Sequence, residues 1–265
     1  MEAGFSRPEL EGDDRKVVAL SFLQKANTSQ MFTESADLYD AIYSFKDYAA
    51  EARQIAALVR SSHPAARRVL DVACGTGEHA RHLAVSHEFE VDGLDIDAGL
   101  LRVAREKHPS GTFFQADMSE FALEKRYDVV LCLFSSIGYL VTLERTRRAL
   151  SCFQRHLAPN GVLFVEPWFP PGGLEHGRVF RHTGTHLGRA VERVSRNEID
   201  GRISRLWFDY YVETPDGVRH ASEVHELGLF TTAEMSTAFQ DAGFQADWDS
   251  VGLSGRGLWV ARAGA

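Results

Sequence analysis

The chain of 265 residues is poor in cysteine and contains no long apolar run. Its three cysteines, Cys74, Cys132 and Cys152, have neither disulfide-framework nor zinc-ligand spacing, and an odd number of this kind is typical of a reducing compartment. No segment approaches the ~18 consecutive apolar residues that a membrane-spanning helix needs. The apolar residues 17–23 follow an acidic stretch, which argues against a secretory signal. We therefore expect a cytoplasmic protein that does not enter the membrane.

A net positive charge is also lacking: 37 acidic residues exceed 29 lysines and arginines, so the formal net charge is −8. Nucleic acid is therefore not expected as a partner, since binding a polyanion requires a basic face. The eleven histidines include two pairs at helical spacing, His79/His82 and His182/His186, but neither pair has the cysteine or carboxylate neighbours of a metal site. We expect no metal. The length suits one α/β domain with an insertion.

The most informative segment that is present covers residues 69–80, Val-Leu-Asp-Val-Ala-Cys-Gly-Thr-Gly-Glu-His-Ala. It is typical of a buried strand, a glycine turn and the start of a helix. A second apolar strand follows at residues 91–96 and carries Asp95 near its end. This pairing predicts an adenosine-bearing cofactor across the tips of two parallel strands. Gly75 lets the backbone approach the ligand, and Asp95 is expected to bind the ribose hydroxyls.

Charge indicates which cofactor this is. A dinucleotide would place its pyrophosphate at the helix N-terminus beyond the glycines. Asp71, at the mouth of the first strand, would repel a pyrophosphate but attract a cation. S-adenosylmethionine carries an ammonium, a sulfonium and no phosphate, so it is the expected cofactor. Asp71 and the backbone of Ala73 and Gly75 are expected to hold its methionine end.

Further residues of the cofactor site follow the next strands. Ile96 ends the second strand, and Asp117 and Met118 follow a third strand at residues 112–115. We expect Asp117 to accept from the adenine amino group and Met118 to cover the ring. A turn or helix cap is the alternative role of Asp117, and the two roles are compatible. Phe134, at the tip of a fourth strand, would border the donor.

The pattern changes after residue 168. Strands are predicted at residues 190–195, 204–212 and 218–230, with hairpin signals between them. Residues 169–230 are thus expected to form an antiparallel β insertion that covers the substrate or builds a dimer. Residues 31–168 and 231–265 would form the cofactor-binding core, an α/β fold with a Rossmann-like seven-stranded sheet. Residues 1–30 are expected to be a mobile leader.

Hydroxyl and imidazole groups suggest an acceptor pocket. Ser135, Ser136 and Tyr139 follow the fourth strand and offer hydroxyls to a polar substrate. His225 lies on an insertion strand beside Glu223 and would act as a base for an amine. A solvated strand face, beside Glu223 and Glu226, is the alternative reading of His225 and the one that the pattern favours.

Several further segments accompany the glycine segment Leu70-Asp-Val-Ala-Cys-Gly-Thr-Gly77. They are residues 36–40 (Ala-Asp-Leu-Tyr-Asp), 46–51 (Lys-Asp-Tyr-Ala-Ala-Glu), 134–139 (Phe-Ser-Ser-Ile-Gly-Tyr), 166–168 (Glu-Pro-Trp), 229–231 (Leu-Phe-Thr) and 254–258 (Ser-Gly-Arg-Gly-Leu). With them, the chain from residue 36 to 261 resembles bacterial class I methyltransferases. The best-known members of that family are the dTDP-3-amino-3,4,6-trideoxyhexose N,N-dimethyltransferases, which make desosamine- and mycaminose-type sugars.

The resemblance implies roles for individual residues. Tyr39 and Tyr48 would reach the methionine end of the donor, and Tyr139 would face the acceptor amine. Arg256 would pair with a substrate diphosphate. Tyr43 and Trp168 are assigned to the same substrate pocket, and the family implies a homodimer.

The chain departs from the family pattern at three places. Met31-Phe32 stand where those enzymes have a tyrosine, Trp168-Phe169 replace a double tryptophan, and Asp95 replaces a glutamate. We expect a methyltransferase that uses S-adenosylmethionine to N-methylate a nucleotide-activated amino sugar. The alternatives are an O- or C-methyltransferase of another natural product or metabolite, a module that only binds the donor, and an NAD-dependent oxidoreductase.

Overall fold

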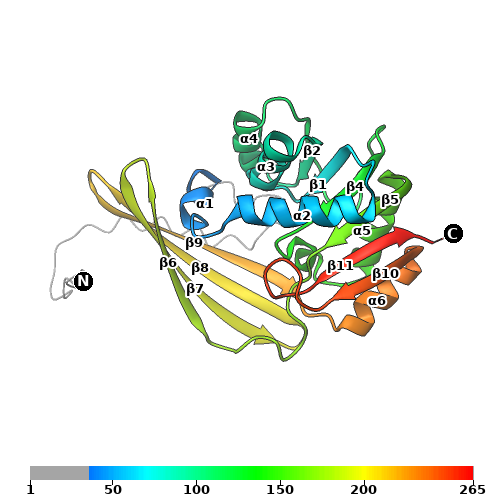
Figure 1. The fold of residues 1–265 in the computed structure, drawn as a ribbon. Coiled ribbons are helices and arrows are strands. Elements are labelled where there is room, and N and C mark those ends of the chain that lie inside the picture. Colours follow the sequence, from blue (N-terminus) through cyan, green and yellow to red (C-terminus); the bar gives the residue numbers. More distant parts are fainter. Residues whose placement is uncertain (1–35, 265) are drawn as a thin grey trace.

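The computed structural model describes residues 36–264, which form two β-sheets with helices (Figure 1). The predicted leader at residues 1–30, and Met31-Phe32, lie outside the described residues. In Figure 1 the helix α1 (Ala36–Ile42) lies against the smaller sheet, and α2 (Tyr48–Ser62) runs across the larger one. No helix of the described part is long and apolar enough to cross a membrane.

The larger sheet has seven strands in the order β10-β11-β5-β4-β1-β2-β3. All neighbours from β5 to β3 are parallel, whereas β11 is antiparallel to both β5 and β10. This order confirms the predicted Rossmann-like seven-stranded sheet. The strands are β1 (Arg68–Val72), β2 (Glu90–Asp95), β3 (Phe113–Gln115), β4 (Tyr127–Cys132), β5 (Leu157–Val165), β10 (Phe244–Asp249) and β11 (Leu258–Ala263).

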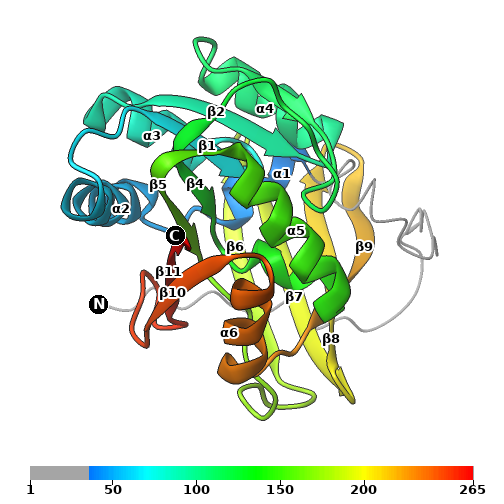
Figure 2. The ribbon, with the colours of Figure 1, turned by 90° about the vertical axis from the view of Figure 1, so that its right-hand side faces the viewer.

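Helices cover both faces of this sheet because its strands are apolar on both sides. Along β1, Val69 packs with α2, α3 (Glu78–His87) and α4 (Ala98–Lys107). The next residue, Leu70, points to the other face and packs with α5 (Leu143–His156) and α6 (Thr232–Asp241). Figure 2 shows α2 and α5 on opposite sides of β4 and β5.

The smaller sheet is an antiparallel meander of β6 (Val179–His186), β7 (Arg189–Asp200), β8 (Ile203–Thr214) and β9 (Gly217–Gly228). It confirms the predicted antiparallel insertion after the fifth strand. The sequence predicts only three strands here, because the largely exposed β6 lacks an alternating apolar pattern. His182 and His186 therefore lie on a strand, so their i,i+4 spacing does not place them on one face of a helix.

The glycine turn joins β1 to α3 with left-handed backbone. Gly77 has a φ of +75°, and a Cβ there would lie 3.0 Å from the Cβ of Ala104 on α4. The turn therefore needs glycine at this position for two reasons, conformation and the close approach of α3 to α4.

Gly77→Ala is expected to lower the free energy of unfolding more than Gly188→Ala. Gly188, at the tip of the β6–β7 hairpin, has a φ of +76° and no neighbouring atom within 4 Å of an added Cβ. Each alanine adds about 1–2 kcal/mol of left-handed strain, but only the Gly77 variant also meets Ala104. Urea denaturation measures both losses. Equal losses would contradict the close approach of the two helices.

Candidate functional site

A cavity of about 830 Å³ lies between the two sheets. One wall is made by the segments that follow β1, β2 and β4, including Gly75, Asp95 and Phe134. The other is made by residues of the smaller sheet such as Arg193 and Phe208. Ligands of open α/β sheets bind beyond the carboxyl ends of the strands, at the point where the strand order reverses. Here that point lies between β1 and β4.

The structure brings most of the predicted site residues to this cavity. Tyr48 and Asp71 instead line an adjoining space of about 40 Å³, which shares Tyr39 and Gly75 with the large cavity. Ser135 and His225 line neither space. The predicted residues on the wall of the large cavity are Tyr39, Tyr43, Ala73, Gly75, Asp95, Ile96, Asp117, Met118, Phe134, Ser136, Tyr139, Trp168 and Arg256.

The carboxylate of Asp95 is fixed at the cavity wall by backbone groups. Its Oδ2 accepts from the N–H of Gly75 at 2.9 Å, and its Oδ1 accepts from the N–H of Asp97 at 2.9 Å. Burial raises the pKa of Asp95 to about 6, although these hydrogen bonds oppose the rise. An added Cβ at Gly75 would meet no atom within 4 Å, so the turn faces open space. A ligand can therefore approach its backbone closely.

Asp71 is buried without a complete set of partners. Its side chain is 2% exposed, and no described residue donates a hydrogen bond to its Oδ2. Burial raises the pKa of this carboxyl to about 6, while His79 opposes the shift. An ionised carboxylate in such a position is costly unless a cation or donor reaches it. The ammonium group of S-adenosylmethionine has the charge and donors that this oxygen lacks, so these residues fit the donor.

Asp117 is engaged by its neighbours. Its Oδ1 accepts from the backbone N–H of Ser119 at 2.8 Å and from the Ser119 hydroxyl at 2.7 Å. Arg145 donates to Oδ2 at 2.8 Å. The side chain thus caps the turn after β3, which is the alternative role considered for it, while it also lines the cavity.

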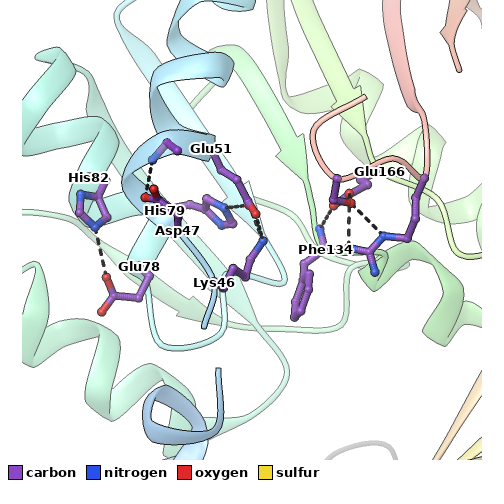
Figure 3. Close-up of polar contacts among 11 residues, drawn as sticks. Lys46, Asp47, Glu51, Glu78, His79, His82, Phe134 and Glu166 are labelled. Carbon is purple, nitrogen blue, oxygen red and sulfur yellow. Dashed lines mark hydrogen bonds and ion pairs between the residues drawn. The ribbon is translucent and has the colours of Figure 1, made fainter. Parts of the chain in front are cut away.

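A buried polar cluster beside the donor wall was not predicted from the sequence. Lys46 donates to Glu51, and His79 Nε2 lies 2.8 Å from Glu51 Oε2 (Figure 3). Burial alone would raise the pKa of Glu51, but the hydrogen bonds from His79 and Lys46 lower it. Lys46 Nζ also lies 4.4 Å from the centroid of the Phe134 ring. The cluster therefore holds α2 and α3 together and places a cation against the ring at the tip of β4.

Glu166 joins two loops at the cavity wall, as Figure 3 shows. It is 1% exposed, and its Oε2 accepts from the N–H of Phe134 at 2.7 Å. Its Oε1 accepts from the Ser254 hydroxyl and lies 3.4 Å from Nη2 of Arg256. The nearby hydroxyl of Ser135 donates to the carbonyl of Pro167 at 2.6 Å, so Ser135 supports this corner from inside. The segment around Glu166 is distinctive in the sequence, but nothing there indicates this linking role.

A chain of polar contacts extends from the cavity into the smaller sheet. The hydroxyl of Tyr139 lies 3.0 Å from Nδ1 of His225, and Nε2 of His225 lies 3.2 Å from Oε2 of Glu223. Tyr210 donates to the same carboxylate oxygen at 3.1 Å. His225 is fully buried, so the alternative of a solvated strand face is wrong. Burial also raises the pKa of Tyr139 well above its ordinary value, which keeps the phenol protonated.

The strand order, the glycine turn and the two acidic strand ends define a class I S-adenosylmethionine-dependent methyltransferase. Within the described residues, no group of three or more His, Cys, Asp or Glu side chains could hold a metal ion. The family described as "Methyltransferase domain" matches residues 69–161, which covers β1 through β4 and α5 into β5.

Similar proteins define the family more closely. The chain is 43% identical over 231 residues to the dTDP-3-amino-3,4,6-trideoxy-alpha-D-glucopyranose N,N-dimethyltransferase of Streptomyces venezuelae, covering 86% of this chain and 97% of the relative. The crystal structure of Streptomyces venezuelae DesVI superposes with a TM-score of 0.80 at 42% identity, covering 87% of this chain and 98% of that chain. SAM-bound CalS10, an amino pentose methyltransferase from Micromonospora echinaspora, gives 0.76 at 36% identity, with 84% and 95% covered.

The chain therefore belongs to the family of S-adenosylmethionine-dependent methyltransferases that contains these amino-sugar N-methyltransferases. It is an enzyme, and S-adenosylmethionine is its methyl donor.

Asp71→Asn is expected to stabilise the ligand-free protein at pH 7.5 and to weaken donor binding at least about tenfold. The pKa of Asp71 is raised from 3.8 to about 6 in the folded state, so ionisation at neutral pH costs on the order of 3 kcal/mol of stability. The protonated carboxyl therefore adds to the free energy of unfolding. This added stability is complete below pH 3.8 and is lost as the pH rises through about 6. Urea unfolding at pH 7.5 and 5 and calorimetry with the donor provide the measurements. An unchanged donor affinity would contradict the role given to Asp71.

Proposed function

We propose that this enzyme transfers methyl groups from S-adenosylmethionine to the amine of a nucleotide-activated amino sugar. The observation that carries the proposal is the contact chain Tyr139–His225–Glu223, which leads away from the cavity beside the donor wall. A cavity of about 830 Å³ is large for one small molecule and has room for a donor and a sugar nucleotide together. Similar proteins support the substrate class, because they are named as dTDP-amino-sugar N,N-dimethyltransferases.

In this proposal the donor lies along the ends of β1, β2 and β3. Asp71 receives its ammonium group, and the backbone of Ala73 and Gly75 lies against the methionine end. Asp95 accepts from both ribose hydroxyls, for which its raised pKa of about 6 still leaves it ionised at neutral pH. The remaining donor contacts are assigned to Tyr39 and Tyr48 at the methionine end, to Phe134 beside the sulfur, and to Ile96, Asp117 and Met118 around the adenine.

The acceptor lies on the side of the smaller sheet. Trp168 and Tyr43 supply flat apolar walls for a sugar ring, and the hydroxyl of Ser136 offers it a hydrogen bond. Ser135 contributes through the Pro167 carbonyl that it holds, since its own hydroxyl is used there. Arg256 keeps its proposed role toward the substrate diphosphate, although Ser254 and Glu166 already occupy two of its N–H groups.

Methyl transfer needs two reactants held in line in a dry cavity and a path for one proton. The donor supplies an electrophilic methyl group on a positively charged sulfur. The neutral amine nitrogen forms the new C–N bond while the C–S bond breaks and its electrons stay on sulfur. Tyr139 accepts the proton that the amine sheds and passes its own hydroxyl proton to Nδ1 of His225. Glu223 orients the ring of His225 by accepting from Nε2.

We also propose that the enzyme is a cytoplasmic homodimer. All three cysteines are free thiols, which suits a reducing compartment. The smaller sheet exposes large apolar side chains at Val179, Leu187 and Val218, which suits contact with a second copy. Sedimentation velocity tests the assembly, and a single monomeric species at micromolar concentration contradicts it.

Incubation with S-adenosylmethionine and a panel of dTDP-amino sugars tests the substrate class. Mass spectrometry is expected to show the gain of one or two methyl groups on the amino sugars. The matched controls carry a hydroxyl in place of the amine and are expected to stay unmodified. Methylation of the hydroxyl compounds, or turnover only with an unrelated acceptor, would overturn the substrate and leave the methyltransferase class intact.

His225→Gln is expected to reduce kcat about 100-fold, within the range of a lost general base. The deficit should shrink as the pH rises, because more of the amine then arrives without its proton. The affinity for S-adenosylmethionine should not change. His220→Gln is the control, since His220 lies on the same strand and pairs with Asp209 away from Tyr139. A loss that is constant across pH would show that His225 serves only packing.

A further inference from the structure

Arg193, on β7, is a buried cation on the acceptor side of the cavity. It is 5% exposed and lines the cavity wall. Its guanidinium lies between two aromatic rings, with its central carbon 4.7 Å from the centroid of Tyr43 and 4.7 Å from that of Phe208. The two rings therefore fix the guanidinium plane at the wall.

The described part of the chain does not balance the charge of Arg193. Its Nε and Nη1 atoms are buried and have no hydrogen-bond partner, and no ion pair is formed by it within residues 36–264. Two other arginines of the wall differ: Arg145 pairs with Asp117 at 2.8 Å, and Arg256 lies 3.4 Å from Glu166. A buried guanidinium without acceptors is costly, so it is retained where a ligand supplies them.

The position of Arg193 relative to the proton path indicates which part of the acceptor it meets. The ring of Phe208 lies 4.7 Å from the central carbon of the guanidinium and 4.7 Å from the ring of His225. His225 in turn contacts the hydroxyl of Tyr139. The cation and the base therefore contact the same aromatic ring, which is close to a hexose ring in size. Such a sugar carries an amine at one carbon and an anomeric phosphate near the other end.

We propose that Arg193 binds the phosphate group attached to the anomeric carbon of the acceptor. This inference rests on the proposed function and deepens it. The guanidinium donates to phosphate oxygens from the N–H groups of its unpaired Nε and Nη1 atoms, and so fixes the distance of the sugar amine from Tyr139. Arg178, which packs over Phe180 at 4.7 Å on the adjacent strand, adds positive charge to the same wall.

Calorimetric titration of dTDP into the protein saturated with S-adenosylhomocysteine tests the inference. Arg193→Gln is expected to raise the Kd for dTDP at least about 30-fold, as removal of one member of a buried charge pair does. Arg193→Lys keeps the charge but loses the planar fork, so a smaller rise is expected. Arg196→Gln is the control, because Arg196 lies on the same strand with a half-exposed side chain paired to Glu198 outside the cavity. All three variants should bind S-adenosylhomocysteine as the wild type does.

Two results overturn this inference but leave the proposed function intact. The first is an unchanged Kd for dTDP, and an unchanged KM for a methylated amino sugar, in Arg193→Gln. The second is a selective loss of S-adenosylhomocysteine binding, which assigns the guanidinium to the carboxylate of the donor. A wild-type protein that binds the donor product but neither binds dTDP nor methylates any dTDP-amino sugar overturns the proposed function as well.

Discussion

The burial of charge without protein partners is the constraint on which the cavity depends. Asp71 at the end of the larger sheet and Arg193 in the smaller sheet are each more than nine-tenths buried, and each leaves polar atoms unpaired. Their charges have opposite sign: Asp71 lies in the adjoining small space, and Arg193 lies on the wall of the large cavity. The fold maintains both because apolar side chains pack around them, on both faces of the larger sheet and around Phe208 in the smaller one. In the proposed function, the positively charged donor and the negatively charged acceptor are thereby drawn to different sides of one space.

The two sheets divide the work of the site. The larger sheet supplies backbone groups and fixed carboxylates, as at Gly75 and Asp95. The hydrogen bond between these two residues fixes their geometry. The smaller sheet supplies long side chains such as Arg193 and Tyr210 that project from a regular surface. Glu166 joins the loop after β4 to the loop between β10 and β11 through contacts with Phe134 and Ser254. The cavity is therefore a property of how the sheets meet and not of either sheet alone.

The glycine turn and the strands around it could be predicted from the sequence because their signals are local. The strand, glycine turn and acidic residue at Asp71, Gly75 and Asp95 are read directly from spacing, and the seven-stranded order follows from alternating strands and helices. The rest depends on contacts between distant residues. Ser254 meets Glu166 across 88 positions, and Tyr139 meets His225 across 86. Arg193 lies on a strand that the sequence predicts, but it carries no motif, and β6 has no apolar alternation. Neither the place of Arg193 on the cavity wall nor the first strand of the smaller sheet could therefore be recognised.

The contact between Tyr139 and His225 joins a segment beside the larger sheet to a strand of the smaller one. Tyr139 comes from η2 (Ser136–Leu140), beside the larger sheet, and His225 comes from β9 of the smaller one. Their 3.0 Å contact exists only while the two layers remain docked. A separation by little more than the diameter of a water molecule breaks the proposed proton route at the same moment that solvent gains entry. In the proposed mechanism, separation of the two layers would therefore remove the base from the site before water could reach the methyl group of the donor.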